Sequence, residues 1–465
     1  MAGQRVAGAP AVSGSVRLGA LLPDVTVPPP GPASRSLAER LSAVESRNVT
    51  HVGEDWPVFW EEAVGANVRD ADGNVYVDLT GGFGVALLGH SHPRVSAALV
   101  DQAYRLVHGM GDVHPPALKV SLLERLAELA PWRETRGVLA STGSEAVEIA
   151  LKTAHLATRR PGVLAFEGGY HGLTLGSLAV TSRPHFRAPF ERRLYRGVAF
   201  APFPDARAAA AGRSERSSEA VLARVREILR EGAPNGDPIG AVIVEPIQGR
   251  AGVRMAPEGF MTELSGLASE AGALVVADEM LTGMGRCGSM FASERVGLVP
   301  DLLCIGKALG AGLPLSACLG ARAVMDAWPT STGEAVHTST FLGHPLACAA
   351  ALAALDSYAP EQVLARVDRV GRRLRTKLEE RLSGARGVAR VGGLGLLVGI
   401  ELGHAGSGAA GMAARVASAC LKDGLLALPA GEVGEVLELT PPVVLTDDQA
   451  DHAIEVLVGA IERIL

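Results

Sequence analysis

Residues 302–314 read LLCIGKALGAGLP, an apolar run that ends at Gly306 and Lys307 and passes into further glycines. Four consecutive apolar residues are typical of a short buried strand. Earlier in the chain, residues 273–279 read ALVVADE, a second apolar run that ends with Asp278 and Glu279. In sheets of parallel strands, ligands bind beyond the carboxyl ends of the strands. The two stretches therefore predict an amine and a carboxylate at the same edge of a buried sheet.

Short apolar runs of this kind recur through the middle of the chain. The seven runs are residues 137–140, 163–166, 198–201, 241–244, 273–277, 302–305 and 315–319. Helical patterns separate several of them, at residues 145–158, 217–230 and 258–271. Apolar strands that alternate with helices are typical of a largely parallel sheet covered on both faces. We predict an α/β fold whose large domain contains a mostly parallel seven-stranded sheet.

The two ends of the chain carry a different pattern. Residues 66–79 show two alternating runs around Asp72-Gly73, a favoured tight turn. A helical stretch from residue 346 leads to an apolar run at 391–402 and a last helix near 447–464. We predict a smaller α+β domain from residues 36–84 and 346–465, and a large domain from 85–345. Residues 1–35, rich in Ala, Gly, Pro and Ser, are expected to be a disordered leader, followed by a helix at 36–48.

Composition and charge narrow the class of protein. The 465 residues include 44 basic and 50 acidic side chains, interleaved, with a net charge of −6, so nothing indicates nucleic acid as a partner. No stretch has the length of a membrane span. The five cysteines form no CxxC pair and no secretory signal is evident, which favours the cytoplasm. The histidines lack a supporting carboxylate or cysteine pattern, so we expect no metal site.

Two charged groups at strand ends suggest a reaction. An amine backed by an apolar sheet is desolvated, which would lower the pKa of Lys307 and make it a nucleophile toward an aldehyde. An isolated lysine is ordinarily solvated, but the flanking glycines and apolar residues favour burial here. Asp278 ends a buried run and needs a partner. That partner is either the protonated ring nitrogen of a cofactor or an arginine in a structural ion pair.

Further positions fit a phosphorylated aromatic cofactor. Gly143 and Ser144 open a helix whose N–H groups can bind phosphate, although a plain helix cap with Glu145 in the first turn explains them too. Thr340, in a polar patch without an evident core role, is a second candidate for the phosphate. Tyr170 follows another predicted strand and either stacks on a ring or belongs to the core.

From about residue 50 to the C-terminus, the chain resembles the class III, or ω-type, aminotransferases of pyridoxal-phosphate fold type I. The motifs are GHSHP at 89–93, STGSEA at 141–146, YHG at 170–172, EPIQG at 245–249, DEMLTGMGR at 278–286, GKALGAGLP at 306–314 and STFLGHPLACAAALA at 339–353. The resemblance implies an aspartate-aminotransferase-like fold and pyridoxal 5'-phosphate (PLP) as cofactor. It also implies amino-group transfer from a small-molecule amine donor to a carbonyl acceptor.

The resemblance assigns the central chemistry to four residues. Lys307 would carry PLP as a Schiff base and move the proton, with pyridoxamine phosphate as the form that holds the amino group. Asp278 would pair with the pyridine nitrogen. Tyr170 would stack on one ring face, and Met280, where the family often has valine, would pack against the other.

The resemblance also implies how the phosphate is held. Gly143 and Ser144 would bind it from the same chain, and Thr340 would bind it from the neighbouring subunit. A homodimer with the site at the subunit interface is therefore expected.

Two positions depart from the family pattern. The ornithine and 4-aminobutyrate enzymes carry a glutamate just after EPIQG, and an arginine before a Pro-Pro pair that grips the substrate carboxylate. Here these positions are Arg250 and Glu438, so the charges are exchanged. We expect the pair to face each other as an inverted gate, in which Arg250 binds a carboxylate and Glu438 attracts a second amino group. Alternatively, both are solvated or the correspondence slips by a residue.

Phe83 is a further candidate for the substrate pocket.

Other reactions remain open on the same groups. Racemases or epimerases, aminomutases and decarboxylases of the family use the same lysine, the same aspartate and the same phosphate-binding residues. A protein that binds PLP without turnover is a further alternative. Amino transfer is the commonest activity in the family and is the function that we expect.

Overall fold

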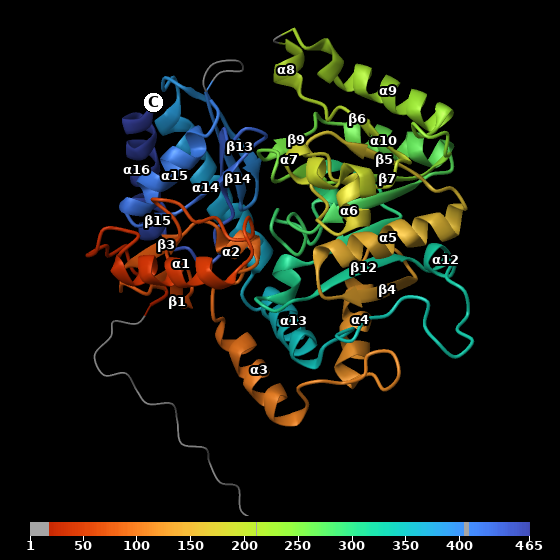
Figure 1. Ribbon diagram of the computed structural model, residues 1–465, viewed down its shortest axis with the longest axis horizontal. Helices are drawn as coiled ribbons and strands as arrows, with labels where there is room; N and C mark the ends of the chain where they lie inside the picture. The colour runs from red at the N-terminus through yellow and green to blue at the C-terminus, as the bar shows by residue number, and fades with distance from the viewer. Residues whose placement is uncertain (1–17, 211, 404–408) are drawn as a thin grey trace, which may run out of the picture.

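The computed structural model describes residues 18–210, 212–403 and 409–465. At its centre lies a seven-stranded sheet with the order β4-β12-β11-β10-β7-β5-β6 (Figure 1). β12 is antiparallel to β4 and β11, and the other pairs are parallel. The seven predicted apolar runs are these seven strands, so the predicted mostly parallel sheet is confirmed. The strands are β4 (Thr135–Ala140), β5 (Gly162–Phe166), β6 (Val198–Ala201), β7 (Ile239–Val244), β10 (Leu274–Glu279), β11 (Leu302–Ile305) and β12 (Ser316–Ala321).

Helices cover both faces of this sheet, because its strands are apolar on both faces. Val242 and Val244 of β7 belong to one buried cluster, and Ile243 between them belongs to another. Successive side chains of a strand point to opposite faces, so each face has its own core. The helices of this region are α3 (Pro93–Arg105), α4 (Ala117–Leu129), α5 (Gly143–Thr158), α6 (Leu175–Val180), α7 (Pro184–Arg187), α8 (Ala206–Ala210), α9 (Ser218–Glu231), α10 (Phe260–Glu270), α11 (Ser293–Val296) and α12 (Arg322–Met325).

The two ends of the chain build smaller sheets together. In one sheet β15 (Leu425–Leu426) lies parallel to β3 (Val75–Asp78), beside β2 (Asn67–Asp70) and β1 (Trp60–Val64), so red and blue elements lie side by side in Figure 1. The predicted turn at Asp72-Gly73 joins β2 and β3. The other elements are β13 (Val388–Leu394), β14 (Leu397–Leu402), β16 (Leu428–Ala430), β17 (Val436–Leu439), α13 (Pro345–Tyr358), α14 (Val363–Leu382), α15 (Met412–Lys422) and α16 (Asp447–Ile464). The domain boundaries at 84/85 and 345/346 remain a proposal.

The expected disordered leader is wrong for residues 18–35. The side-chain oxygen of Asn67 accepts hydrogen bonds from the backbone nitrogens of Gly19 (3.0 Å) and Leu21 (2.9 Å). Asn74 binds the nitrogens of Thr26 and Val27 in the same way. These two buried amides anchor an extended segment that its composition did not reveal. The helix predicted at 36–48 is α1 (Pro32–Val44), which begins earlier because Pro32 suits the first turn. Residues 1–17 lie outside the described residues.

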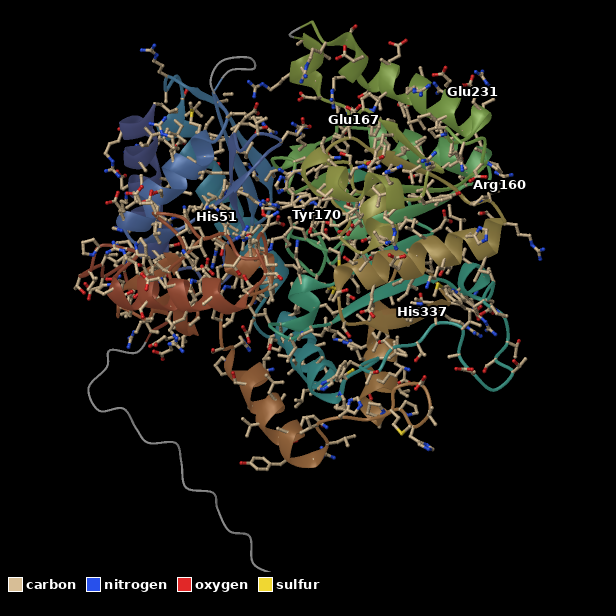
Figure 2. All side chains as sticks on the ribbon, in the orientation of Figure 1. His51, Arg160, Glu167, Tyr170, Glu231 and His337 are labelled. Carbon is tan, nitrogen blue, oxygen red and sulfur yellow. The ribbon has the colours of Figure 1, made fainter. Side chains whose placement is uncertain are left out.

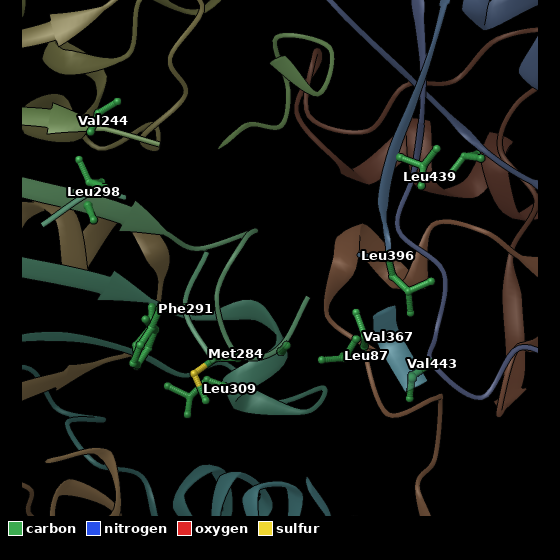
Figure 3. Packing of buried hydrophobic residues seen from close by; sticks show 14 of the residues in the cluster. Leu87, Val244, Met284, Phe291, Leu298, Leu309, Val367, Leu396, Leu439 and Val443 are labelled. Carbon is green, nitrogen blue, oxygen red and sulfur yellow. The ribbon is translucent and has the colours of Figure 1, made fainter. Parts of the chain in front are cut away.

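One apolar core joins the large sheet to the terminal elements. Leu309 and Met284 follow β11 and β10, and they belong to the same buried cluster as Leu87, Leu396 and Val443 (Figure 3). The site edge of the sheet is therefore packed against segments from both ends of the chain. Among the helices of the described residues, none combines the length and the apolar character that a bilayer span requires.

A buried arginine ties the same segments together. Arg286 is fully buried and donates hydrogen bonds to the backbone oxygens of Gly84 (3.0 Å), Leu396 (3.3 Å) and Pro441 (2.7 Å). Burial lowers the pKa of its guanidinium to about 10. Three carbonyl dipoles offset the desolvation of this cation, so its position fixes where the three segments meet.

Gly371→Ala should destabilise the protein, although alanine usually stabilises a helix. Gly371 is buried in α14, and a Cβ there would lie 1.9 Å from the backbone oxygen of Gly395. We expect a loss of about 1–3 kcal/mol from overpacking, seen as a lower midpoint of thermal unfolding. Gly266→Ala in α10 is the matched control, because no atom lies within 4 Å of its Cβ. It should stabilise by about 0.5–1 kcal/mol, and equal effects of both changes would contradict this account of the packing.

Candidate active site

Lys307 and Asp278 lie at the same edge of the large sheet. β10 and β11 are parallel neighbours, with Glu279 opposite Ile305, so Asp278 lies close to the start of the segment that carries Lys307. Burial lowers the pKa of the Lys307 amine, and the negative charges of Glu438, Asp278 and Glu245 offset this only in part. Lys307 has φ +44°, in the left-handed region that is rare outside glycine. Such backbone strain is concentrated at functional sites.

The carboxylate of Asp278 has a histidine as its hydrogen-bonding partner. It is 3% exposed, and its Oδ2 is 2.7 Å from Nδ1 of His171. Its Oδ1 accepts a hydrogen bond from the backbone nitrogen of Met280 at 3.0 Å. Burial alone would lower the pKa of His171, but the hydrogen bond and the charge of Asp278 raise it. The alternative of a structural ion pair with an arginine is therefore wrong, and His171 fixes the orientation of the carboxylate.

Glu245 completes a buried cluster of titratable groups. Its carboxylate accepts hydrogen bonds from the backbone nitrogens of Tyr170 (3.0 Å) and Gly249 (3.1 Å). Burial raises the pKa of Glu245 to about 7, and the neighbouring His171 opposes that shift. Sequence reasoning missed the roles of His171 and Glu245. The available signal was their position, since both stand in segments that follow strands of the sheet.

The N-terminus of α5 forms the candidate phosphate cradle. Thr142 caps the helix by accepting the backbone N–H of Glu145 (3.2 Å). The helix cap is therefore Thr142, the residue before Gly143. The Ser144 hydroxyl oxygen accepts the backbone N–H of Leu173 at 3.1 Å. A Cβ on Gly143 would lie 3.0 Å from the sulfur of Met280. A side chain at this position would have to displace the Met280 side chain by a few tenths of an ångström, so the helix start approaches this edge of the sheet closely.

Met280 and Tyr170, the two expected ring contacts, lie in segments that follow strands β10 and β5. A Cβ on Gly306 would lie 2.6 Å from the Met280 sulfur, so this side chain lies against both the Gly143 and the Gly306 backbones. Tyr170 is half-buried, with its ring centroid 5.5 Å from that of Phe186. Figure 2 shows it where the elements of the large sheet meet the C-terminal elements. Tyr170 therefore keeps a free part of its ring at the site edge and is not wholly a core residue.

Thr340 and Phe83 lie on exposed segments. Thr340 stands between Thr338, which donates to Asp112 (2.7 Å), and Phe341, whose ring meets that of His108. Within the described residues, no hydrogen bond joins Thr340 to the cradle of its own chain. Phe83 is 61% exposed and has φ +61°, within a left-handed turn at residues 81–84. The turn packs closely, since a Cβ on Gly81 would lie 2.5 Å from the Thr440 backbone oxygen.

Arg250 and Glu438 face each other, as expected from their exchanged charges. Nη1 of Arg250 is 3.6 Å from Oε2 of Glu438. The carboxylate is 3% exposed, whereas Arg250 is 30% exposed. The alternative of two solvated side chains is therefore wrong for Glu438, which is buried beside Arg250. Their action as a gate remains a prediction.

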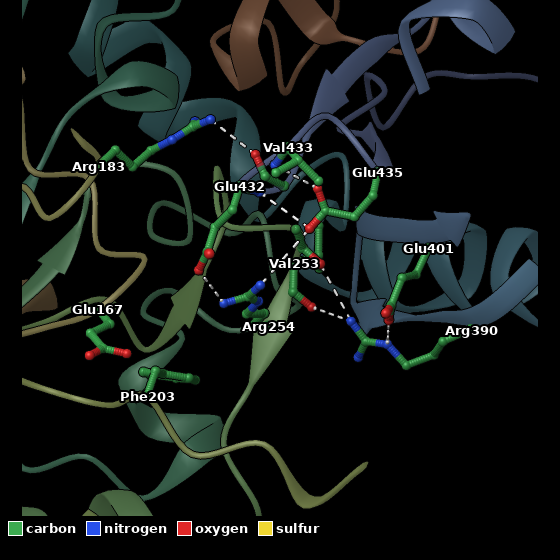
Figure 4. A network of polar contacts seen from close by, with 12 residues as sticks. Glu167, Arg183, Phe203, Val253, Arg254, Arg390, Glu401, Glu432, Val433 and Glu435 are labelled. Carbon is green, nitrogen blue, oxygen red and sulfur yellow. Dashed lines mark hydrogen bonds and ion pairs between the residues drawn. The ribbon is translucent and has the colours of Figure 1, made fainter. Parts of the chain in front are cut away.

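An additional arginine lies near this pair. Arg183 donates a hydrogen bond to the backbone oxygen of Gly431 at 3.0 Å, and its pKa is lowered by burial and then by the charge of Arg250. Arg254 pairs with Glu432 at 3.0 Å in the same network of the loop between β16 and β17 (Figure 4). Sequence reasoning missed Arg183, because it follows a short helix and not a strand of the sheet.

Comparisons with known proteins agree with this geometry. The family model of the class III aminotransferases matches residues 49–461. The 5-aminovalerate aminotransferase of Pseudomonas aeruginosa is 35% identical, over 93% of this chain and 99% of that protein. The alanine/serine racemase of Pyrococcus horikoshii is 32% identical, over 95% of this chain and 93% of that protein. A PLP-bound amine transaminase from an uncultivated Pseudomonas species is 28% identical and has a TM-score of 0.80, over 91% of this chain and 99% of that one.

The chain belongs to the class III aminotransferases. It is a PLP-dependent enzyme of fold type I that transfers amino groups. The residues at the sheet edge fit the cofactor chemically. They supply a desolvated amine for the aldehyde, a fixed carboxylate for the ring nitrogen and a helix N-terminus with a glycine for the phosphate.

Proposed function

We propose that Lys307 would hold the cofactor aldehyde through Nζ and would accept and return the proton at the substrate carbon. When bound, PLP supplies an electron sink for the charge that develops at that carbon. Asp278 holds a proton on the ring nitrogen, and His171 holds Asp278 in place. The buried Lys307 amine at this edge of the sheet is the observation that carries this assignment, because burial lowers its pKa and so disfavours the charged form that cannot accept a proton.

The surrounding contacts follow from the same placement. Gly143 and Ser144 would bind the phosphate at the start of α5, and Tyr170 and Met280 would enclose the ring between them. This proposal is supported by the close approach of the Met280 sulfur to the Gly143 backbone at the helix start. The apolar side chain of Phe83, exposed beside the site, would form one wall of the substrate pocket.

Amino transfer and racemisation can be separated by one spectroscopic experiment. Purified holoenzyme is mixed with an excess of an amine donor and no acceptor. A transaminase keeps the amino group on the cofactor as pyridoxamine phosphate, so the yellow absorbance of the cofactor should bleach. The absorbance should return when a keto acid is added. A racemase would leave the absorbance in place and invert a chiral amino acid instead. That result would overturn the proposal in favour of the activity that the Pyrococcus protein is named for.

We propose that the enzyme is a homodimer in which Thr340 of each chain reaches the phosphate bound by the other. Apolar side chains gather on α3, on the segment after it and at Phe341 beside Thr340. These exposed residues are Val100, Tyr104, Leu106, Val107, Met110, Val113 and Phe341. Exposed apolar area of this extent usually marks an interface, and Thr340 needs a second chain to contact a cradle. Analytical ultracentrifugation should find twice the mass of the chain, and a monomer would contradict the proposal.

A cytoplasmic location is proposed on the chemistry of the cysteines. All five are free and buried. Unpaired thiols persist in reducing compartments.

We also propose that Arg250 and Glu438 act as the inverted gate. The Arg250→Ala variant should raise the KM for 2-oxo acids by about 10- to 100-fold, because a charge-assisted hydrogen bond to the carboxylate is lost. The KM for neutral aldehyde acceptors should change little. Arg254→Ala is the control, since it removes an arginine that pairs with Glu432 in the same network. Equal changes for carboxylate and neutral acceptors would rule out the gate.

A further inference from the structure

Glu438 presents an unused hydrogen-bond acceptor inside the site. It is 3% exposed, and among the described residues its Oε2 has no hydrogen-bond partner. The nearest cation is Nη1 of Arg250 at 3.6 Å, which also lacks a hydrogen-bond partner within those residues. A buried carboxylate without hydrogen bonds costs free energy, so this arrangement favours a ligand that can donate to Oε2.

The backbone holds this carboxylate in one position. Glu438 lies in β17 between Gly399 of β14 and Leu428 of β16. Just after it, the Thr440 hydroxyl donates to the backbone oxygen of Thr80 at 2.6 Å and thereby ties the strand to the left-handed turn at residues 81–84. The backbone at Glu438 is therefore fixed by its neighbours on both sides. Arg250 is the more exposed partner, with 30% of its side chain accessible to solvent.

Glu438 is also linked to the buried cluster at the sheet edge, because its partner Arg250 directly follows Gly249, which donates its backbone N–H to Glu245 at 3.1 Å. Among the charged groups that raise the pKa of Lys307, Glu438 has the largest effect, ahead of Asp278 and Glu245. A substrate amine that takes the place of the Lys307 amine thus reacts within short range of a buried negative charge. A second cation on the same short substrate would reach Oε2, whereas a carboxylate in that position would be repelled.

We propose that the natural amine donor is a short alkyl diamine, which reacts through one amino group while Glu438 binds the other as an ammonium group. This inference rests on the proposed transaminase function. The reacting amino group passes to the keto acceptor, and water supplies the oxygen of the aminoaldehyde product. The second amino group leaves unchanged. Arg250 turns away from Glu438 when the diamine binds and is then free for the carboxylate of the acceptor.

Three donors with four carbons each test the inference. The bleaching rate of the holoenzyme is measured with 1,4-diaminobutane, 1-aminobutane and 4-aminobutyrate, each without acceptor. The second-order rate constant for the diamine should exceed that for 1-aminobutane by about 10- to 100-fold, the value of one charge-assisted hydrogen bond. In Glu438→Gln this ratio should fall close to one. Glu432→Gln, which removes a neighbouring acid outside the pair, should keep the ratio.

A binding measurement separates this inference from the transaminase proposal. N,N,N',N'-tetramethyl-1,4-diaminobutane carries two positive charges but cannot react with the cofactor aldehyde. Calorimetry should show that it binds the wild-type holoenzyme about 10- to 100-fold more tightly than it binds Glu438→Gln. If the wild type binds this compound more tightly but no amine bleaches the cofactor, the cation site at Glu438 is supported and the transaminase function is overturned. The assignment of a diamine as the natural donor would be overturned if 4-aminobutyrate reacted faster than the diamine. Equal rates for the diamine and 1-aminobutane would overturn it too.

Discussion

Lys307→Ala should lower kcat for amino transfer by at least about 10⁴-fold, because the variant loses both the nucleophile and the base. No other lysine among the described residues is at this edge of the large sheet, so none can replace it. The second expected result is chemical. Borohydride should attach the cofactor permanently to the wild-type chain at Lys307, as found by peptide mass spectrometry, and should attach none to the variant.

The control for this change is Lys422→Ala. Lys422 is an exposed lysine at the end of α15, and its ion pair with Asp55 lies on the surface. That variant should keep the wild-type rate and the wild-type labelling. If Lys307→Ala still turned over at a rate near that of the wild type, or if borohydride labelled a different lysine, the assignment of the reacting amine would be wrong.

Asp278→Asn should lower kcat by about 10²- to 10³-fold, the usual effect of removing one preorganised electrostatic group. Asparagine has almost the same shape, but it carries no charge to keep a ring nitrogen protonated. The change also removes the anion that raises the pKa of His171. Since burial alone lowers that pKa, the imidazole should become neutral throughout the neutral pH range, which NMR of the ring protons can detect.

Asp301→Asn is the matched control at the opposite edge of the same sheet. Asp301 precedes β11 and accepts a hydrogen bond from the Val275 backbone nitrogen at 2.8 Å. Its loss should reduce stability and leave both kcat and the titration of His171 unchanged. A fully active Asp278→Asn enzyme, or a His171 that still titrates above its ordinary pKa, would contradict the role assigned to the carboxylate.

The large sheet and the reacting pair could be predicted because local pattern and tertiary environment agree there. A strand buried on both faces must be a continuous apolar run, and a polar residue at its end is then conspicuous. Lys307 and Asp278 were found in this way. Arg250 and Glu438 required the family resemblance, because Arg250 lies in the loop of a short hairpin (residues 247–255) and Glu438 lies within a terminal strand.

Other features depend on contacts that the local sequence does not encode. Residues 18–30 have the composition of a disordered leader, yet distant Asn67 and Asn74 order them. His171 stands beside Tyr170 in the sequence, but its contact with Asp278 joins the loop after β5 to the end of β10. Arg183 reaches the site only because the loop at Gly431 packs beside it.

The carbonyl partners of Arg286 have a consequence for biosynthesis. They belong to residues 84, 396 and 441, so two of the three are made after the reacting lysine and close to the end of the chain. During translation the guanidinium must therefore stay hydrated. The three segments cannot pack around it, beside the sheet edge that carries Lys307, until the last strand has left the ribosome. The enzyme should gain its cofactor only after synthesis is complete, and chains that stop before residue 441 should be substrates for chaperones and proteases.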